Sequence, residues 1–422
     1  MAPPSDSASV LITGAAGGIG RATALRLARQ GWHCVLVDAD AAALERLQAA
    51  WPAAAPLPLA LVADLTDRAR IAALGPRLPP LDALINNAGM SAGGADVLAG
   101  ADQGADQGAA QRLLALNLAA PAHMVRVCTP HLRAGARIVN VASGAGLRAI
   151  PWRGLYSASK AGLIAQTQAL ARARPDWSVS ALSPGFVRTE LVQGLIASQR
   201  LNLAQVLSRI PLARMAEPED MAEALAFLVS PGARPCAGQL LVVDGGSSIY
   251  GGSQPLPASR QPALPLDTPL ALQCTAIADP QWQAALAHWP MAEPSAAAYP
   301  AVLDGRALNA PTGAVLAAVL DAARAFRAAH THQASLTLLL PSASSDALPW
   351  EQAGDAAAAR MAVATLAAEW GAAGLRINAL APAADCAAAD CLPLLDYLVG
   401  ARAQFLTGQV LHPAAGLAPA LP

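Results

Sequence analysis

The sequence contains few charged side chains, few aromatic ones and a single lysine. Of its 422 residues, 14% are charged and 4% are aromatic, the formal net charge is −1, and Lys160 is the only lysine. Because no excess of basic side chains creates a positive field, the composition does not favour binding to nucleic acid or to anionic lipid. We therefore expect a protein that works without either of these partners.

Three further features are missing, and each excludes a class of protein. The six cysteines show no CxxC spacing, which argues against a zinc site or a disulfide framework. No stretch of about 18 residues is continuously apolar, so no membrane-spanning helix is expected. The first residues lack the charged and apolar segments of a signal peptide. These absences predict a cytoplasmic protein with free thiols and no bound metal.

The sequence does contain a regular alternation of apolar runs and alanine- and leucine-rich helical stretches from Ser9 onward. The runs expected to be strands are Val10–Ile12, Cys34–Val37, Ala60–Val62, Ala83–Ile85, Ile138–Val141, Val179–Leu182 and Leu240–Val243. This order predicts an α/β fold, a Rossmann-type doubly wound parallel sheet with helices on both faces. The predicted domain spans residues 1–252. Within it, a tandem repeat at residues 101–108 is expected to be a surface loop without a function.

The remaining residues predict a linker and a smaller α/β domain. Four prolines in residues 253–267 are typical of an extended linker. Residues 268–422 then repeat features of the end of the first domain. The similar segments are Arg376–Pro382 with Ser178–Pro184, and Tyr397–Val399 with Phe227–Val229. The repeat indicates a shortened, degenerate copy of the first domain, although chance likeness between two alanine-rich sequences is an alternative.

The first predicted strand runs directly into a glycine-rich turn, and a helical stretch follows at once. The residues of this turn that we expect to contact a cofactor are Thr13, Gly14, Gly18, Ile19 and Gly20. Glycines let the backbone turn tightly and approach a pyrophosphate, and the helix N-terminus offers free N–H groups. In the first βα turn of a predicted parallel sheet, this motif indicates a dinucleotide-binding site.

Two carboxylates at strand ends extend the predicted cofactor site. Asp38 ends the second strand, eighteen residues beyond Gly20. There it can accept hydrogen bonds from both hydroxyls of the adenosine ribose and would repel a 2′-phosphate, which predicts NAD(H) rather than NADP(H). Asp64 and Leu65 end the third strand and are expected near the adenine. An aspartate in such a place is also often only a helix cap.

Lys160 stands four positions after Tyr156. A sequence that uses arginine everywhere else is expected to keep its lysine for a task that a guanidinium performs badly. A compact ammonium can sit beneath a phenol, hold a sugar hydroxyl and join a proton relay. Survival of one lysine by chance in a chain of biased composition is the alternative. We expect this pair to carry the chemistry.

The order and spacing of these motifs resemble the short-chain dehydrogenase/reductase family from about residue 8 to residue 252. The matching elements are the glycine turn, the strand end Asn87-Ala88-Gly89, Asn117, Ser143, the Tyr156 and Lys160 pair, and Ser183-Pro184-Gly185. The resemblance implies that Tyr156 is the general acid/base, with Lys160 and the positive charge of the nicotinamide favouring its phenolate form. Lys160 would also hold the nicotinamide ribose, Ser143 would hydrogen-bond the substrate oxygen, and Asn117 would anchor a proton-relaying water.

The same resemblance implies the surroundings of the nicotinamide. The additional cofactor contacts are expected at Asn87, Ala88, Gly89, Pro184, Gly185, Val187 and Thr189. Residues 190–212 would form a mobile substrate lid, in which Arg200 and Arg209 are expected to be solvated. Contact of either arginine with an acidic group is the alternative. Met90, Trp152 and Arg153 would help to line the substrate pocket.

The second domain is expected to have lost both cofactor binding and catalysis. Gln352 and Ala356 fall roughly where the tyrosine and the lysine would stand, and no glycine-rich turn precedes them. The segment between Pro382 and Tyr397 is too short for a substrate lid. What remains corresponds to the segments through which members of the family commonly dimerise. We therefore expect a homo-oligomeric protein whose second domain serves as an internal pseudo-partner.

Taken with the resemblance, these residues predict an NAD(H)-dependent oxidoreductase that interconverts a secondary alcohol and a ketone. An NADH-linked 3-oxoacyl thioester reductase is the enzyme alternative, because Ile210–Arg214 and Asp244–Gly246 resemble such reductases. A dinucleotide-sensing or scaffold protein is the alternative from another class. The intact set of Ser143, Tyr156 and Lys160 argues against it.

Overall fold

A computed structural model places most of the chain. It describes residues 8–91, 107–148, 150, 155–197, 199, 201–252, 254–259, 261–287, 289, 298–311, 313–342 and 350–415. Trp152, Arg153 and Arg200 lie outside the described residues, as does the tandem repeat up to residue 106.

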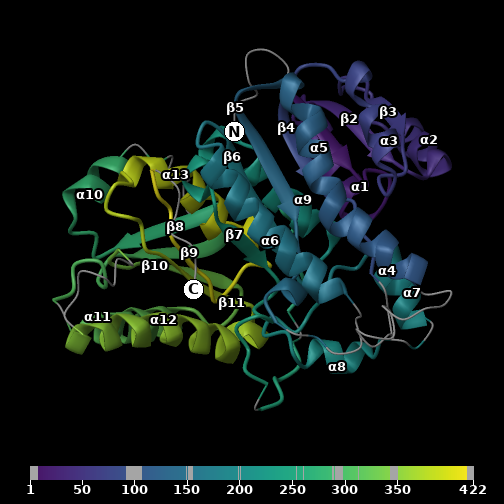
Figure 1. Cartoon of the computed structure of the whole chain (residues 1–422). Coiled ribbons are helices and arrows are strands. Elements are labelled where there is room, and N and C mark those ends of the chain that lie inside the picture. Colours follow the sequence, from purple (N-terminus) through teal and green to yellow (C-terminus); the bar gives the residue numbers. More distant parts are fainter. Residues whose placement is uncertain are drawn as a thin grey trace.

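The first half of the chain forms a seven-stranded parallel sheet in the order β3-β2-β1-β4-β5-β6-β7 (Figure 1). Its strands are β1 (Ser9–Thr13), β2 (His33–Asp38), β3 (Leu59–Val62), β4 (Leu81–Asn86), β5 (Leu132–Val141), β6 (Ser178–Pro184) and β7 (Leu240–Val243). All seven predicted strands are confirmed, and so is the Rossmann-type doubly wound fold. The strand order reverses between β1 and β4, the place where such sheets bind ligands beyond their strand ends.

Helices cover both faces of this sheet. They are α1 (Gly18–Arg29), α2 (Ala41–Ala49), α3 (Arg68–Ala72), α4 (Gln107–Leu114), α5 (Ala120–Cys128), α6 (Tyr156–Ala173), α7 (Glu190–Ala197), α8 (Leu203–Leu207) and α9 (Pro218–Leu228). Because successive strand residues point to opposite faces, Val10 and Ile12 pack in one core with α1, α2 and α9. Leu11 packs in a second core with α3, α5 and α6.

The second half of the chain forms a five-stranded parallel sheet in the order β12-β11-β10-β9-β8. Its strands are β8 (Leu270–Thr275), β9 (Tyr299–Asp304), β10 (Ala334–Leu339), β11 (Leu375–Leu380) and β12 (Val410–Leu411). Its helices are α10 (Pro280–Leu286), α11 (Val315–Ala329), α12 (Trp350–Trp370) and α13 (Ala388–Val399). The strand order is the one that β7, β6, β5, β4 and β1 follow in the first sheet. Among the described residues, this sheet has no counterparts of β2 and β3.

Helices α10 and α13 contact each other on one side of the second sheet, and α11 and α12 lie side by side on the other (Figure 1). The first pairing matches the contact between α1 and α9 in the first half. The arrangement agrees with the repeat seen in the sequence, in which α13 corresponds to α9.

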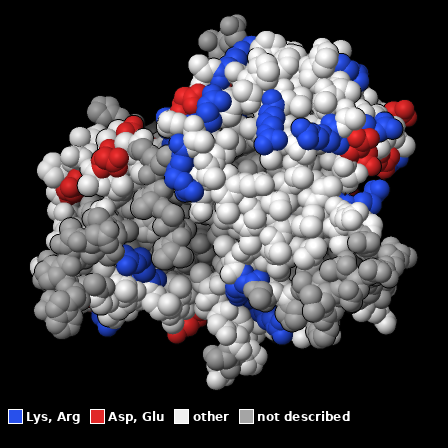
Figure 2. Space-filling model, viewed as in Figure 1, with Lys and Arg blue, Asp and Glu red and all other residues white. Residues whose placement is uncertain are grey.

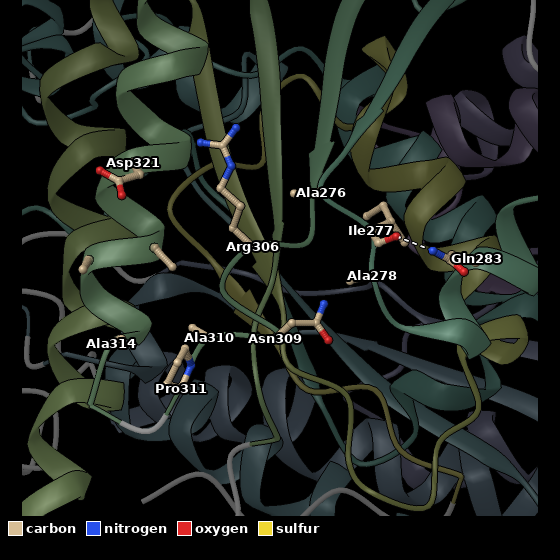
Figure 3. Close-up of a pocket in the computed structure, with 12 residues that line it drawn as sticks. Ala276, Ile277, Ala278, Gln283, Arg306, Asn309, Ala310, Pro311, Ala314 and Asp321 are labelled. Carbon is tan, nitrogen blue, oxygen red and sulfur yellow. Dashed lines mark hydrogen bonds between the residues drawn. The ribbon is translucent and has the colours of Figure 1, made fainter.

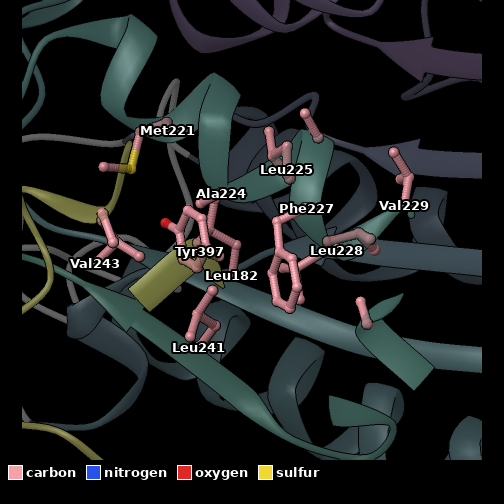
Figure 4. Packing of buried hydrophobic residues seen from close by; sticks show 14 of the residues in the cluster. Leu182, Met221, Ala224, Leu225, Phe227, Leu228, Val229, Leu241, Val243 and Tyr397 are labelled. Atoms are coloured by element: carbon pink, nitrogen blue, oxygen red, sulfur yellow. The ribbon is translucent and has the colours of Figure 1, made fainter. Parts of the chain in front are cut away.

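The two halves pack against each other through these corresponding helices. Phe227 of α9 and Tyr397 of α13, which occupy equivalent positions in the repeat, stack with ring centroids 4.8 Å apart (Figure 4). Other contacts between the two halves are reciprocal as well. Helix α13 contacts the 3-10 turn η5 (Pro231–Cys236) that follows α9, and α9 contacts the turn η8 (Ala401–Ala403) that follows α13. Equivalent surfaces that meet in this way are the mark of a two-fold, isologous contact.

A buried arginine holds the end of α13 in place. Arg376 of β11 is 1% exposed. Its guanidinium donates to the carbonyl oxygens of Leu398, Val399, Gly400, Ala403 and Leu406. These carbonyls lie at the C-terminus of the helix and in the following turn, where the helix dipole favours a cation.

Charged side chains of both signs are interspersed on the face shown in Figure 2, and its centre is largely uncharged. No helix in the described part of the chain has the length and apolar character needed to cross a membrane.

Candidate active site

The glycine turn after β1 forms a cradle that larger residues would fill. Gly14 has a φ of 62°, and a Cβ there would lie 2.9 Å from the Cα of Ala88. A Cβ on Gly20 would overlap the carbonyl oxygen of Gly14, so this glycine lets α1 pack closely on β1. Gly17, by contrast, faces open space. The turn therefore leaves the N-terminus of α1 accessible to a ligand.

Two predicted cofactor residues use their side chains to join this turn to β4. Thr13 Oγ1 accepts hydrogen bonds from the backbone N–H groups of Asn87 and Ala88, each at 3.0 Å. Asn87 Nδ2 donates to the carbonyl oxygens of Thr13 and Gly14, also at 3.0 Å. These bonds join the ends of β1 and β4 at the point where the strand order reverses.

Asp38 lies where the sequence predicted it, at the end of β2 beside the glycine turn. Its Oδ2 accepts a hydrogen bond from the backbone N–H of Ala16 at 2.9 Å, and its Oδ1 accepts one from Asp40 at 3.1 Å. The carboxylate is half-buried. It therefore stands fixed beside the glycine turn with lone pairs available for further donors.

Asp64 and Leu65 lie at the end of the next strand. Asp64 Oδ1 accepts bonds from the backbone N–H and the hydroxyl of Thr66 at 2.9 and 2.7 Å. These hydrogen bonds, the backbone one foremost, lower the pKa of Asp64. Asp64 is not the N-cap of α3, because Asp67 fills that position. The helix-cap interpretation is therefore wrong for Asp64, and Leu65 is buried beside it.

The segment after β6 returns to the glycine turn. Val187 forms a bridge with Ala216, and a Cβ on Gly18 would lie 3.0 Å from Thr189 Cγ2. Pro184 ends β6, and Gly185 follows it and approaches the backbone of Asp244. The predicted contacts in this segment thus lie at the same end of the sheet as the glycine turn.

Lys160 is buried in the floor of the site. It is 4% exposed, and its ammonium donates to the carbonyl oxygen of Val141 at 2.9 Å. Burial lowers the pKa of Lys160 to about 8. Its Nζ lies 5.9 Å from the ring centroid of Tyr156, which is half-buried at the first turn of α6. A Cβ on Gly89 would lie 3.4 Å from this Nζ, so β4 and α6 converge on the lysine.

Asn117 lies in a π-helical turn, Ala115–Ala119, between α4 and α5. The turn is an interruption of the kind often found at functional sites. The amide is fully buried, accepts from the backbone N–H of Met90 and donates to its carbonyl oxygen, each at 2.9 Å. It also donates to Ser159 Oγ at 3.3 Å, and Ser159 donates to the carbonyl oxygen of Tyr156 at 2.7 Å. Ser159, which the sequence analysis passed over, links Asn117 to the helix of the tyrosine.

Ser143 follows β5 and caps the short turn η4 (Gly144–Gly146), where its Oγ accepts the N–H of Ala145 at 3.2 Å. A Cβ on Gly146 would lie 2.8 Å from the carbonyl carbon of Lys160. This turn therefore rests directly on α6, and the serine stands at the same end of the sheet as Tyr156.

The residues present fit a dinucleotide, because the glycine turn leaves open space at the N-terminus of α1 and a carboxylate stands at the end of β2. The fold and the site together define a dinucleotide-binding α/β protein. The family model described as enoyl-(acyl carrier protein) reductase matches residues 14–248. The chain therefore belongs to the short-chain dehydrogenase/reductase family.

Relatives support this assignment and differ in their substrates. An uncharacterized short-chain type dehydrogenase/reductase of Sinorhizobium fredii is 38% identical over 240 residues, which are 56% of this chain and 43% of that protein. The chain thus spans less than half the length of that relative. A 3-oxoacyl-(acyl-carrier-protein) reductase FabG of Thermotoga maritima is 33% identical over 250 residues, 57% of this chain and 97% of that protein.

A solved structure adds information on the cofactor. A putative NAD(P)-dependent gluconate 5-dehydrogenase from Beutenbergia cavernae, crystallised with NADP, is 32% identical with a TM-score of 0.52 and covers 58% of this chain and 98% of that chain. These relatives support an NAD(P)-dependent oxidoreductase, while their substrates differ from one another.

The second half retains the geometry of the glycine turn without its glycines. Thr275 Oγ1 lies 3.4 Å from the carbonyl oxygen of Leu303, as Thr13 Oγ1 does from that of Ile85. Unlike Thr13, Thr275 also has a carboxylate acceptor, Asp304 Oδ2 at 2.9 Å. Ala276 follows with a φ of 53°, in the place of Gly14 with its φ of 62°. The turn has the same length, but Asp279 caps α10 in the position that Gly17 takes at α1.

This aspartate closes the end of the helix. Its Oδ1 accepts the N–H groups of Gln281 and Trp282 at 2.9 and 3.0 Å. A carboxylate of the chain thus occupies the donors that a pyrophosphate would need. A cavity of about 790 Å³ remains beyond the ends of β8 and β9, lined by Ile277, Gln283, Arg306, Asn309 and Asp321 and by alanine and proline side chains (Figure 3). Arg306 is paired there with the buried Asp304 at 3.3 Å.

The start of α12 has a structural role in the second half, because it caps α11. Asp355, next to Ala356, accepts the N–H groups of Val315 and Leu316 at 2.8 and 3.2 Å and so caps α11. Gln352 belongs to α12, at a position whose side chain is outside the described ones.

Proposed function

We propose that the protein is an NAD(H)-dependent oxidoreductase that interconverts a secondary alcohol and a ketone, with the reaction confined to its first half. The observation that carries this proposal is the only lysine of the chain, buried one helical turn from Tyr156 with its ammonium beside the ends of β4 and β5. Burying an ammonium costs free energy even where it is hydrogen-bonded, which supports a functional reason for keeping this lysine. Fold alone would not justify the choice.

A bound nicotinamide would supply the hydride acceptor or donor for the carbon of the substrate. For alcohol oxidation, the phenolate of Tyr156 takes the hydroxyl proton as the C–H electron pair leaves, and for reduction the phenol returns it. Lys160 favours the phenolate by its charge and holds the ribose hydroxyls, and Ser143 Oγ orients the substrate oxygen. Because the amide of Asn117 is committed to Met90 and Ser159, the relay water is assigned to the backbone of its π turn.

The preference for NAD(H) over NADP(H) rests on Asp38. Its carboxylate, fixed by Ala16 and Asp40 at the end of β2, can accept the two ribose hydroxyls and repels a phosphate dianion at the 2′ position. The predicted contacts at Thr13 and Asn87 are proposed to act through the backbone, since both side chains hold the turn together.

A 3-oxoacyl thioester reductase is the second candidate. It is favoured by the likeness to a reductase of that name and by the segment Ile210–Arg214. A sensing or scaffold role is disfavoured because Ser143, Tyr156 and Lys160 are all kept at one end of the sheet. All six cysteines are free thiols, in keeping with the reducing cytoplasm to which we assign the protein.

For the second half we propose the role of an internal pseudo-partner. The reciprocal packing of α9 with η8 and of α13 with η5, together with the Phe227 and Tyr397 stack, supports this role. Since this surface of the first half is covered within the chain, a homo-oligomer would assemble through other faces. The proposed domain limits remain 1–252, a linker at 253–267, and 268–422.

The test is an absorbance assay of NADH formation and consumption. Wild-type protein would be given NAD(H) or NADP(H) with secondary alcohols, hydroxy acids, sugars and 3-hydroxyacyl thioesters, and their ketones. Turnover with NAD and free alcohols supports the proposal, and turnover with thioesters alone supports the reductase. Tight binding of NADH without turnover on the whole panel would replace both with the sensing role.

A further inference from the structure

The substrate-lid segment, residues 190–212, is held differently at its two ends. Its first residue, Glu190, is exposed and contacts only the glycine turn and Arg21 among its described partners. Its last residues, Ile210, Pro211 and Leu212, are buried. The buried end therefore fixes the position of the segment more firmly than the exposed end does.

The buried end rests on the second half of the chain. Leu212 donates its N–H to the carbonyl oxygen of Gly245 at 3.1 Å, and Gly245 donates to the carbonyl oxygen of Phe405 at 2.9 Å. A Cβ on Gly245 would lie 2.7 Å from both Ile210 Cγ2 and Phe405 Cζ. A backbone chain of two hydrogen bonds thus connects the lid to Phe405, with side chains packed tightly around it.

A second residue of the same half meets the lid directly. A Cβ on Gly371 would overlap the carbonyl group of Pro211. Next to this contact Ala213 has a φ of 49°, a left-handed conformation that is strained for a residue other than glycine. Strain of this kind persists only where the surroundings impose it, and here part of the surroundings comes from the second half.

Phe405 also reaches the side chain that follows the lid. It is fully buried, and the guanidinium of Arg214 lies over its ring, 4.8 Å from the centroid. Arg214 is in turn bonded to Asp220 of α9 at 3.1 Å. The phenyl ring therefore lies between the last residues of the lid and helix α9, which packs against the second half.

We infer that Phe405 of the second half is a positioning residue for the substrate lid of the first half. Through Gly245 and Arg214 it fixes the hinge at Ile210–Ala213, about which the exposed part of the lid closes over substrate. The second half, which has lost its own site, thus contributes to the site of the first. This inference rests on the proposed function, because that function supplies the substrate over which the lid closes.

The test compares Phe405→Ala with Phe405→Leu and with a matched control, Phe326→Ala. Phe326 is also a buried phenylalanine of the second half, but it packs on Trp370 within that half. In Phe405→Ala we expect the KM for substrate to rise about tenfold with a smaller change in kcat. The Kd for NADH stays at the wild-type value. Phe405→Leu restores most of the loss, and Phe326→Ala shows none of it.

A second readout does not depend on turnover. Hydrogen exchange of peptides from residues 190–209 should accelerate in Phe405→Ala, and again in Gly371→Ala, while peptides of α1 keep their rates. Unchanged KM and unchanged exchange in folded Phe405→Ala would overturn the inference, as would the same change in Phe326→Ala. If wild type turns over no substrate, the proposed function fails, and the exchange rates still decide whether Phe405 holds the lid.

Discussion

The carboxylate of Glu190 accepts a hydrogen bond from the backbone N–H of Gly18, 3.2 Å away, at the N-terminus of α1. This N–H is one of the donors that a bound pyrophosphate would use. The same carboxylate lies 3.8 Å from Arg21. An acidic side chain of the lid therefore competes with the cofactor for the positive end of the helix.

We expect Glu190→Gln to bind NADH more tightly, by roughly two- to fivefold, because an exposed charge at a helix terminus contributes up to about 1 kcal/mol. Fluorescence titration with NADH measures the change. Glu219→Gln is the control, since it removes the same charge from an exposed position at the start of α9. Equal affinities of Glu190→Gln and wild type would show that the carboxylate does not compete.

Gly17→Asp should weaken cofactor binding without harming the fold. Gly17 is the N-cap of α1 in an extended conformation and faces open space, so an aspartate fits and caps the helix as Asp279 does in the second half. We expect a Tm equal to or above that of wild type, and NADH affinity reduced roughly 10- to 30-fold by the charge.

Gly17→Ser provides the neutral cap for comparison and should lose much less affinity. Calorimetry of wild type should give one NADH per chain, because Asp279 already closes the second turn. Two sites per chain, or normal binding to Gly17→Asp, would contradict this account of the two turns.

Lys160 should make the stability of the protein depend on pH in a defined window. Its pKa falls from 10.5 to about 8 on folding, and burial is the cause. Below pH 8 both states hold the proton, and the folded state carries the full penalty of a buried ammonium. Between pH 8 and 10.5 only the unfolded state holds it, so the free energy of unfolding rises with pH.

Lys160→Met lacks this contribution to the pH dependence of the free energy of unfolding, since methionine does not titrate. Relative to the variant, wild type should therefore gain about 2 kcal/mol of stability between about pH 7 and about pH 9.5. Urea unfolding of both proteins at the two pH values gives the difference. If the difference in free energy of unfolding is the same at both pH values, or if wild type loses stability relative to the variant at the higher pH, burial does not disfavour the charged form of Lys160.

Arg376→Met should destabilise the second half by roughly 3 kcal/mol, because the carbonyl oxygens of Leu398, Gly400 and Ala403 lose the only side-chain donor described for them. Arg376→Lys should recover little, since an ammonium offers fewer donors in a different geometry. Arg324→Met, at an exposed ion pair, should leave the unfolding midpoint within error. Thermal unfolding of the three variants measures the effect, and equal midpoints for Arg376→Met and Arg324→Met would contradict it.

The fold of the first half could be predicted because the glycine turn, Asp38, Tyr156 and Lys160 stand at spacings typical of the short-chain dehydrogenase/reductase family. The sequence did not predict β8 and β9. There the turn between strand and helix keeps its left-handed residue as Ala276, and alanine carries no signal for that conformation. In the sequence, Asp279 resembles any other helix cap. That it occupies the position of the N-cap of α1 becomes evident only when α10 is compared with α1 in the structure.

Glu190, Ser159 and Phe405 were missed for a related reason. Each acts through a contact between segments far apart in the chain, such as the 3.2 Å bond from Gly18 to Glu190 or the 2.9 Å bond from Gly245 to Phe405. Single residues of common types carry no periodicity or spacing that would reveal such partners. Only the packed structure brings them together.

The most direct test of the central claim is to measure hydride transfer and NADH binding in Tyr156→Phe beside wild type. The account predicts that the variant binds NADH with the wild-type Kd, while turnover of the best alcohol with NAD falls about a thousandfold, since only the proton-exchanging oxygen is lost. Turnover that survives loss of this hydroxyl would contradict the assignment of Tyr156 as the general acid/base of the reaction.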